Sequence, residues 1–158
     1  MAYTFTEIKD CHNAKMASIV RKNLENVGLD IPGTAYFDSS LDCLSSYYGQ
    51  PDRMYFVLLR DNAVVGGVGF APFELSDSCA EMQKLYLDDS VKGQGLGYTL
   101  VEKVEEEMRK AGFRKSYLET HSSLKAAVHL YRKCGYREIE RPDGVIHSTM
   151  DLFFEKDL

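Results

Sequence analysis

The chain has 158 residues, of which 44% are hydrophobic, and its formal net charge at neutral pH is −5. This length and apolar content predict one domain, residues 1–158, whose core is large enough to fold without disulfides. The acidic balance contains no basic run, so we expect no nucleic-acid partner, and a cationic substrate is weakly favoured.

The cysteines give a second bound on the class of protein. Cys11, Cys43, Cys79 and Cys134 show no C-x-x-C spacing, so we expect free thiols in a reducing compartment. No metal-ligand spacing occurs either. The N-terminus has no apolar signal segment, and no run of about 18 apolar residues appears. The sequence therefore predicts a soluble, cytoplasmic protein with no membrane partner.

The first part of the chain predicts one strand and two helices. Tyr3 to Ile8 alternates as a strand does, and Asp10 is expected to cap a helix whose apolar residues recur every three or four positions until Gly28. Residues 29–37 form a loop with two aromatic side chains, and such loops often shape a substrate mouth. We expect Asp38 to cap a second helix, which carries Leu41, Leu44 and Tyr48.

After this helical region the pattern changes to that of a sheet. Met54 to Arg60 and Ala63 to Phe70 predict two strands joined by a two-residue turn, Asp61-Asn62. Three glycines inside the second strand, at positions 66, 67 and 69, indicate a bulge or a close neighbour. Ala80 to Leu87 predicts a further strand.

The second half of the chain alternates helices and strands. A helix follows from Leu96 and ends at Gly112, with apolar residues on one face and charges on the other. The remaining expected elements are a strand at Lys115 to Thr120, a helix at Leu124 to Lys133, and strands at Tyr136 to Ile139 and His147 to Phe154 around a Pro142-Asp143-Gly144 turn. The order β-α-α-β-β-β-α-β-α-β-β predicts a mixed sheet with helices on both faces.

One stretch is dense in glycine and lies where a strand gives way to a helix. It reads Lys92-Gly-Gln-Gly-Leu-Gly-Tyr98, so unhindered backbone amides at a helix start could bind phosphate. A P-loop would place a lysine directly after its second glycine, and a dinucleotide motif would place a third glycine where Tyr98 stands. Neither spacing fits. A basic residue followed by Gly-x-Gly suits the pyrophosphate of a ligand with a long thin arm, such as coenzyme A.

Three segments of the sequence combine into a recognisable set. They are Leu85-Tyr-Leu87, Lys92-Gly-Gln-Gly95-Leu-Gly97 and Ala127-x-x-Leu-Tyr131-x-x-x-Gly135-Tyr136. In this order and spacing they resemble the GNAT superfamily of acyl-CoA-dependent N-acyltransferases, with a core over residues 53–141. The resemblance implies an α/β (α+β) fold: a mixed, mostly antiparallel sheet with two splayed central parallel strands and helices on both faces.

The sequence departs from the family's pattern at two positions. Lys92 stands where the family usually has Gln or Arg; the lysine keeps a positive charge but loses the bidentate fork of arginine. Leu124 stands where many members have an asparagine that contacts the pantetheine arm, so we assign Leu124 only an apolar role.

The resemblance implies acetyl-CoA as cosubstrate, bound between the strands Ala80 to Leu87 and Lys115 to Thr120. Its pantetheine amides would pair with the backbone near Leu85, Tyr86 and Leu87, as an added strand does. We also assign cofactor binding to Ala127. The pyrophosphate would meet the loop formed by Lys92, Gly93, Gln94, Gly95, Leu96, Gly97 and Tyr98.

Acetyl transfer to an amine needs a neutral nucleophile, a stabilised oxyanion and a protonated leaving thiol. An alkylamine with a pKa of about 10.4 must first lose a proton. The resemblance implies that an amide near Leu87 holds the oxyanion and that Tyr131 protonates the thiolate. Glu81 is the first candidate for the base, acting through a water molecule, and Glu119 and His121 are alternatives.

We therefore expect an N-acetyltransferase that transfers the acetyl group directly to a primary amine of a small molecule. Two alternatives stay open: acetylation of a protein N-terminus or lysine, and a non-catalytic module that binds or senses CoA. Acceptor specificity should lie in residues 29–50 and 70–79. The last expected strand, from Met150 to Phe154, could support a homodimer.

Overall fold

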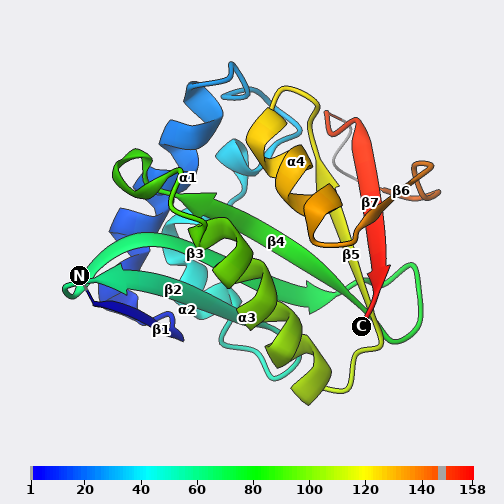
Figure 1. Cartoon of the computed structure of the whole chain (residues 1–158), viewed down its shortest axis with the longest axis horizontal. Coiled ribbons are helices and arrows are strands. Elements are labelled where there is room, and N and C mark those ends of the chain that lie inside the picture. Colours follow the sequence, from blue (N-terminus) through cyan, green and yellow to red (C-terminus); the bar gives the residue numbers. More distant parts are fainter. Residues whose placement is uncertain (1, 146–148) are drawn as a thin grey trace.

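In the computed structural model, which describes residues 2–145 and 149–158, the strands of these residues form one seven-stranded sheet (Figure 1). The spatial order is β1-β2-β3-β4-β5-β7-β6, and neighbours run antiparallel except β4 and β5, which are parallel. The predicted mixed sheet is confirmed. The strands are β1 (Tyr3–Glu7), β2 (Met54–Arg60), β3 (Ala63–Pro72), β4 (Cys79–Leu87), β5 (Lys115–Thr120), β6 (Arg137–Ile139) and β7 (Leu152–Asp157).

Helices cover both faces of the sheet, as predicted. Figure 1 shows α3 (Leu96–Lys110) and α4 (Lys125–Lys133) in front of the strands, with α1 (Asn13–Glu25) and the single turn α2 (Leu44–Tyr47) behind them. Because successive side chains of a strand point to opposite faces, β2 supplies both cores. Phe56 and Leu58 belong to the cluster under α3 and α4, and Tyr55 and Val57 to the cluster under α1 and α2.

The glycines of β3 make room for a tyrosine of the neighbouring strand. A Cβ at Gly67 or Gly69 would lie 2.6 Å or 2.4 Å from atoms of the Tyr55 ring, closer than any real contact allows. The Tyr55 hydroxyl donates a 2.7 Å hydrogen bond to the carbonyl of Lys84 in β4. The close neighbour that the glycines predicted is therefore the side chain that holds β4 in place.

β4 contains a bulge in its middle. Gly67 pairs with Tyr86 and Gly69 with Gln83, so a single β3 residue lies opposite two residues of β4. Lys84, at this point, has a φ of +51°, which side chains other than glycine rarely adopt. The bulge interrupts the alternation of side chains, so Gln83 hydrogen-bonds Tyr48 beside α2 while Lys84 contacts Asp38 on the same face.

The N-terminal predictions need two corrections. Asp10 does not cap α1: it begins a 3-10 turn, Asp10–His12, and its carboxylate accepts a hydrogen bond from Ser45. The expected second helix is a 3-10 turn, Leu41–Cys43, followed by the short α2. Asp38 does not cap it, because its carboxylate lies 2.8 Å from the Lys84 ammonium.

The last strand also differs from the prediction. β7 runs over Leu152–Asp157, whereas His147 to Phe154 was expected; positions 147 and 148 lie outside the described residues. The pairing with β5 fixes this register, since Thr120 lies opposite Leu152 and Lys115 opposite Asp157. By contrast, the predicted turn at Asp61-Asn62 is confirmed, with positive φ at both residues. Among the described residues, no helix is long and apolar enough to cross a bilayer.

A buried polar cluster anchors α3 on the sheet. The Glu105 carboxylate lies 2.9 Å and 3.0 Å from the Lys156 ammonium of β7. It also accepts a 2.9 Å hydrogen bond from the Tyr136 hydroxyl, which lies 2.7 Å from the hydroxyl of Ser116 in β5. Because a buried carboxylate is costly unless it is paired, these bonds fix the position of the helix that begins with the glycine loop.

Candidate active site

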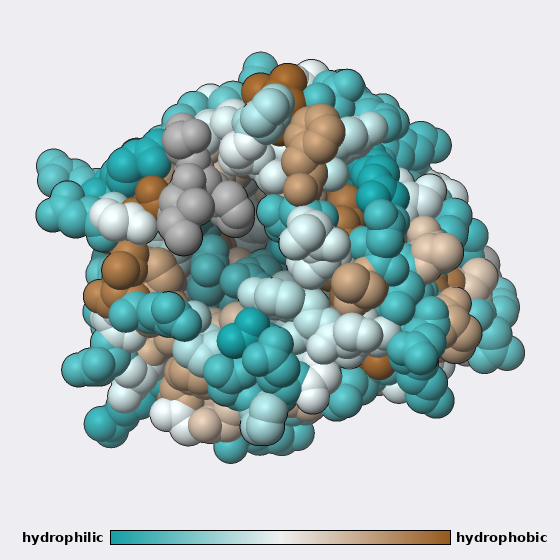
Figure 2. Space-filling model, turned by 180° about the vertical axis from the view of Figure 1, so that it is seen from behind, coloured by the Kyte–Doolittle hydropathy of each residue, from teal (hydrophilic) through white to brown (hydrophobic). Residues whose placement is uncertain are grey.

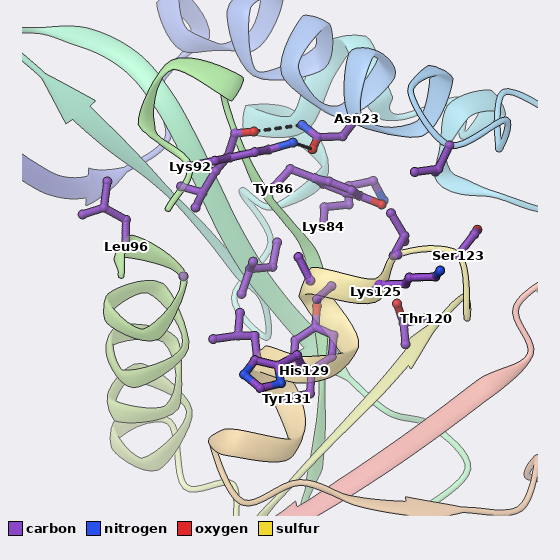
Figure 3. A pocket seen from close by; sticks show the side chains of 18 of the residues that line it. Asn23, Lys84, Tyr86, Lys92, Leu96, Thr120, Ser123, Lys125, His129 and Tyr131 are labelled. Carbon is purple, nitrogen blue, oxygen red and sulfur yellow. Dashed lines mark hydrogen bonds between the residues drawn. The ribbon is translucent and has the colours of Figure 1, made fainter. Parts of the chain in front are cut away.

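A cavity of about 650 Å³ lies where β4 and β5 separate (Figure 3). The two strands pair only from Cys79 to Glu81 on β4 and from Lys115 to Tyr117 on β5, and beyond this point their edges diverge. The volume is in the range of small-molecule sites. The cavity's walls come from the end of α1, the outer part of β4, the glycine loop, the end of β5 and α4.

The three glycines of the loop have different structural roles. Gly93 and Gly95 have φ values of +78° and +76°, and a Cβ at either position would meet open space. They therefore set the course of the backbone and leave it accessible. Gly97 lies inside α3, where a Cβ would come within 2.9 Å of the Leu130 side chain of α4. Its role is the close approach of the two helices that flank the cavity.

The start of α3 suits an anion. Gly95 is the N-cap and offers no side chain to the first amides of the helix, and the first turn contains no acidic residue. Helix N-termini of this kind bind phosphate through unpaired N–H groups and the helix dipole. The loop and the helix start are both in the wall of the cavity, so an anion bound there would lie at the cavity's edge.

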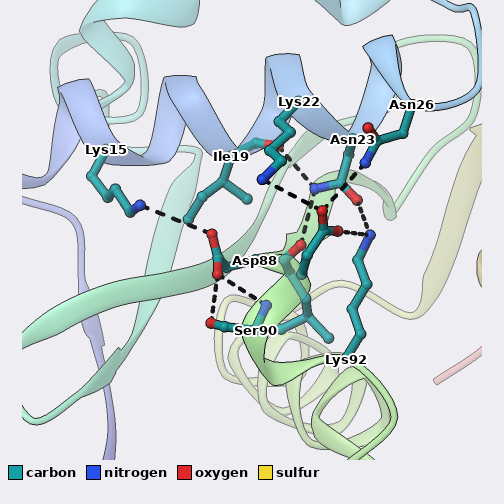
Figure 4. A network of polar contacts seen from close by, with 10 residues as sticks. Lys15, Ile19, Lys22, Asn23, Asn26, Asp88, Ser90 and Lys92 are labelled. Carbon is teal, nitrogen blue, oxygen red and sulfur yellow. Dashed lines mark hydrogen bonds and ion pairs between the residues drawn. The ribbon is translucent and has the colours of Figure 1, made fainter.

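Lys92 is held by a polar network that joins the loop to α1 (Figure 4). Its ammonium lies 2.7 Å from Asn23 Oδ1 and 2.8 Å from Asp89 Oδ1. The Asn23 amide donates to the carbonyl of Leu87 at 2.9 Å and to that of Ile19 at 2.8 Å. One side chain of α1 thus fixes both the end of β4 and the cation of the loop.

Sequence reasoning did not identify Asn23. Its position on an amphipathic helix predicts only a polar face, and no short motif connects it with a loop some 70 residues later in the chain. Lys92 also lowers the pKa of the Asp89 carboxyl by donating a hydrogen bond to it. The cation of the loop is therefore neutralised within the protein itself.

Tyr131 lies in the cavity wall on α4, opposite β4 (Figure 3). Its side chain packs in the core beside Tyr136 and Phe154, and the residue is 7% exposed. Burial, followed by the proximity of Tyr86, raises the pKa of Tyr131 well above that of a free tyrosine. The hydroxyl therefore stays protonated at neutral and moderately alkaline pH, as a proton donor must.

Two carboxylates lie on the same face of the sheet, near the point where the strands separate. Glu81 of β4 is paired in register with Tyr117 of β5, and the Tyr117 hydroxyl donates a 2.9 Å hydrogen bond to Glu119. Burial and the Glu119 carboxylate raise the pKa of Tyr117. Glu119 is part of the cavity wall, whereas Glu81 is not and instead accepts a hydrogen bond from Gln83.

The structure brings most of the predicted site residues together. In the cavity wall are Tyr131, Leu85, Tyr86, Leu87, Lys92, Gly93, Gly95, Leu96, Gly97, Tyr98 and Ala127. The side chain of Gln94 lies outside it, where it accepts a hydrogen bond from Tyr3. His121 also lies outside it: its ring contacts Ser123, and its Nε2 lies 3.8 Å from Asp151. Leu124 is in the wall, in keeping with its apolar role.

Comparison with known proteins gives a consistent result. A sequence model of the acetyltransferase (GNAT) family matches residues 21–136. The Escherichia coli (strain K12) protein called "Uncharacterized N-acetyltransferase YjgM" is 36% identical over 130 residues, which span 81% of this chain and 78% of that protein. The chain therefore belongs to the GNAT family of acetyltransferases, as the three motifs predicted.

Solved structures agree on the fold. A GNAT-family acetyltransferase from Staphylococcus aureus Mu50 superposes with a TM-score of 0.87 at 18% identity, covering 99% of each chain. The PaiA N-acetyltransferase of Thermoplasma acidophilum, solved in complex with coenzyme A, superposes with a TM-score of 0.77 at 18% identity, covering 100% of each chain.

Gly95→Ala should weaken acetyl-CoA binding by roughly tenfold, because a Cβ at this positive φ strains the backbone by about 1 kcal/mol and turns the loop amides away from the phosphates. Isothermal titration calorimetry measures the Kd. Gly112→Ala is a matched control, since Gly112 also has a positive φ, +92°, and open space, but lies at the far end of α3. We expect it to leave the Kd within about twofold; equal Kd values for both variants and the wild type would contradict phosphate binding by this loop.

Proposed function

We propose that this protein transfers the acetyl group of acetyl-CoA directly to a primary amine of a small molecule. The observation that carries the proposal is the cavity between the diverging ends of β4 and β5, with an accessible glycine loop at one side and Tyr131 on the helix opposite. Family membership supports the reaction class, and the geometry supports the assignment of roles to residues.

The cavity fits the cosubstrate at both of its chemical ends. The open space at Gly93 and Gly95 leaves room for a diphosphate against the loop amides. The separated edges of β4 and β5 offer backbone groups near Leu85 and Leu87 that could pair with the pantetheine amides. When bound, acetyl-CoA would supply the acetyl group as a thioester. The remaining functions, namely orientation and proton transfer, belong to this chain's own residues.

Tyr131 is the proposed general acid. As the new C–N bond forms and the C–S bond breaks, the phenol would give its proton to the departing sulfur and afterwards regain one from solvent. Its raised pKa suits this role, because the group is protonated before the reaction throughout the neutral range. A backbone amide near Leu87 is proposed to stabilise the charge on the carbonyl oxygen.

A carboxylate of β4 or β5 is the proposed acceptor of the amine's proton. The sequence favours Glu81, acting through a water molecule, and the position of Glu119 in the cavity wall makes it the more direct candidate. The hydrogen bond from Tyr117 orients the Glu119 carboxylate. Glu119 would accept the proton from within the cavity, whereas Glu81, outside the wall, would need a bound water to reach the amine.

A contact between two segments on the α1 and α2 side of the sheet favours a small acceptor over a protein. The hydroxyl of Thr149, just before β7, donates a 2.8 Å hydrogen bond to the carbonyl of Pro32 in the loop after α1. These two segments therefore meet, whereas a polypeptide acceptor would need an open groove there. Figure 2 shows this side of the molecule as largely hydrophilic, with small and separate apolar patches, unlike a broad protein-binding surface.

A panel of acceptors tests the proposed function. We expect the purified protein with acetyl-CoA to release free thiol, measured with a chromogenic thiol reagent, in the presence of at least one small primary amine. Short peptides with a free N-terminus or a lysine should be poor acceptors by comparison. Turnover with peptides alone would instead favour protein acetylation, and acetyl-CoA binding without thiol release from any acceptor would favour a CoA-sensing module.

Tyr131→Phe should lower kcat by roughly 100-fold while the Kd for acetyl-CoA stays within about twofold, because only the proton donor is removed. Steady-state kinetics and calorimetry provide the two numbers. Tyr47→Phe, which removes a tyrosine hydroxyl from α2 outside the cavity wall, is the control and should leave kcat unchanged. A Tyr131→Phe variant with wild-type turnover across a pH series would remove Tyr131 from the mechanism.

Glu119→Gln should lower kcat/KM at pH 7 by roughly 100-fold, since most of the amine is then charged and nothing accepts its proton. The defect should shrink as the pH approaches about 10, where the amine is neutral without help. Glu81→Gln, measured in parallel, should have the smaller effect because Glu81 is not in the cavity wall. If the loss and its alkaline recovery follow Glu81 instead, Glu81 is the base.

A further inference from the structure

Lys84 brings a positively charged side chain to the cavity wall, away from the phosphate loop. It is in the cavity wall, and its side chain is 11% exposed. It lies three residues before Leu87, the last residue of β4, which is a rise of roughly 10 Å along the strand. Lys92 already serves the loop. The Lys84 ammonium is therefore not expected to bind the diphosphate.

The bulge in β4 directs this ammonium to the face of the sheet that α1 and α2 cover. Lys84 Nζ lies 2.8 Å from Asp38 in the loop before α2. Tyr86, two residues later in β4, packs against the core cluster under α1 and α2. The cosubstrate's phosphates belong at the start of α3, on the opposite face. The acceptor is therefore expected to approach from the side where Lys84 lies.

The conformation and the burial of Lys84 both lower the stability of the folded state. A left-handed φ of +51° at a residue other than glycine costs about 1 kcal/mol. Removing an ammonium and a carboxylate from water costs several kcal/mol, and apolar residues of similar volume often give equal or greater stability than such a pair. A methionine at this position could fill the same space without that cost. The charge is therefore better explained by a ligand than by stability.

From these contacts we infer that Lys84 binds a carboxylate of the acceptor, and that the acceptor is an amine that also carries a carboxylate, as an amino acid does. This inference rests on the proposed function and names its substrate class. An ammonium has three N–H donors; among residues 2–145 and 149–158 Asp38 accepts one of them and fixes its direction, which leaves donors for the substrate. Glu119 lies in the same cavity wall. Glu119 would therefore contact the acceptor's amine, and Lys84 at the bulge would contact its carboxylate.

The test compares matched acceptors. The purified chain is assayed by thiol release from acetyl-CoA with a panel of L-α-amino acids and with the α-carboxamide of each. The amine of a carboxamide is less basic, so amine availability alone would favour the amide. We expect the acids to have a kcat/KM at least roughly tenfold higher, the effect of one charge-assisted hydrogen bond in a partly buried site.

Lys84→Met should remove this discrimination. We expect it to lower kcat/KM for the acids by roughly tenfold or more, chiefly through KM, and to leave the amides within about twofold. Lys84→Arg should retain part of the preference, because a cation remains. Asp38→Asn is the matched control, because it breaks the same ion pair without removing the cation. If the pair only links the loop before α2 to β4, both Asp38→Asn and Lys84→Met should lower kcat/KM equally for acids and amides.

Three results would overturn the inference. The first is equal kcat/KM for acids and amides with the wild-type protein, a result that does not depend on the folding of any variant. The second is an equal loss for both acceptor types in Lys84→Met. The third is turnover only of amines that carry no carboxylate. In each of these the acetyltransferase function itself stands. Acetyl-CoA binding without thiol release from any acceptor contradicts the proposed function, and the inference with it.

Discussion

The site depends on how soon the pairing of β4 and β5 ends. Only three residues of each strand are paired, and the outer part of β4, which contains the bulge, continues beyond the paired segment. In most sheets such unpaired backbone edges would be a liability. Here they line a cavity whose volume is in the range of small-molecule sites. Tyr131 on α4 and the backbone of Leu85 to Leu87 line the same cavity. The proposed general acid and the proposed cosubstrate site therefore both depend on the early end of the β4–β5 pairing.

The site also depends on the bulge in β4, which residues outside the cavity wall maintain. Gly67 and Gly69 of β3 leave space for the Tyr55 ring, whose hydroxyl bonds the carbonyl of Lys84. This bond satisfies a carbonyl that the bulge takes out of the ladder, and it stabilises the positive φ at Lys84. The glycines of β3 therefore act on the site through Tyr55. Without the bulge, the strand would alternate normally, and Lys84 and Gln83 could not both contact elements on the α1 and α2 face.

The sequence predicts well what local patterns determine. Strand and helix periodicity, the Asp61-Asn62 turn and the Gly93 to Gly97 spacing each follow from a few neighbouring residues, and the structure contains the turn, the loop and the expected elements other than the second helix and the bounds of the last strand. It predicts poorly what depends on tertiary partners. Asp10 and Asp38 have the chemistry of helix caps, but their carboxylates contact Ser45 and Lys84 instead, and neither side chain caps a helix. Asn23 and Lys84 could not be found from their sequence neighbourhoods, because their roles come from contacts with segments 69 and 46 residues away.

The contacts of Lys92 indicate which interactions can supply affinity for a diphosphate. In the protein alone its ammonium already has Asp89 and Asn23 as partners, each within 2.8 Å. A phosphate that attracts Lys92 must replace or share these partners, so the net gain is the difference between two charge-assisted contacts and is smaller than either. The amides at the start of α3 have no side-chain cap from Gly95 to replace. The larger share of the binding energy should therefore come from the backbone and not from the side chain of residue 92.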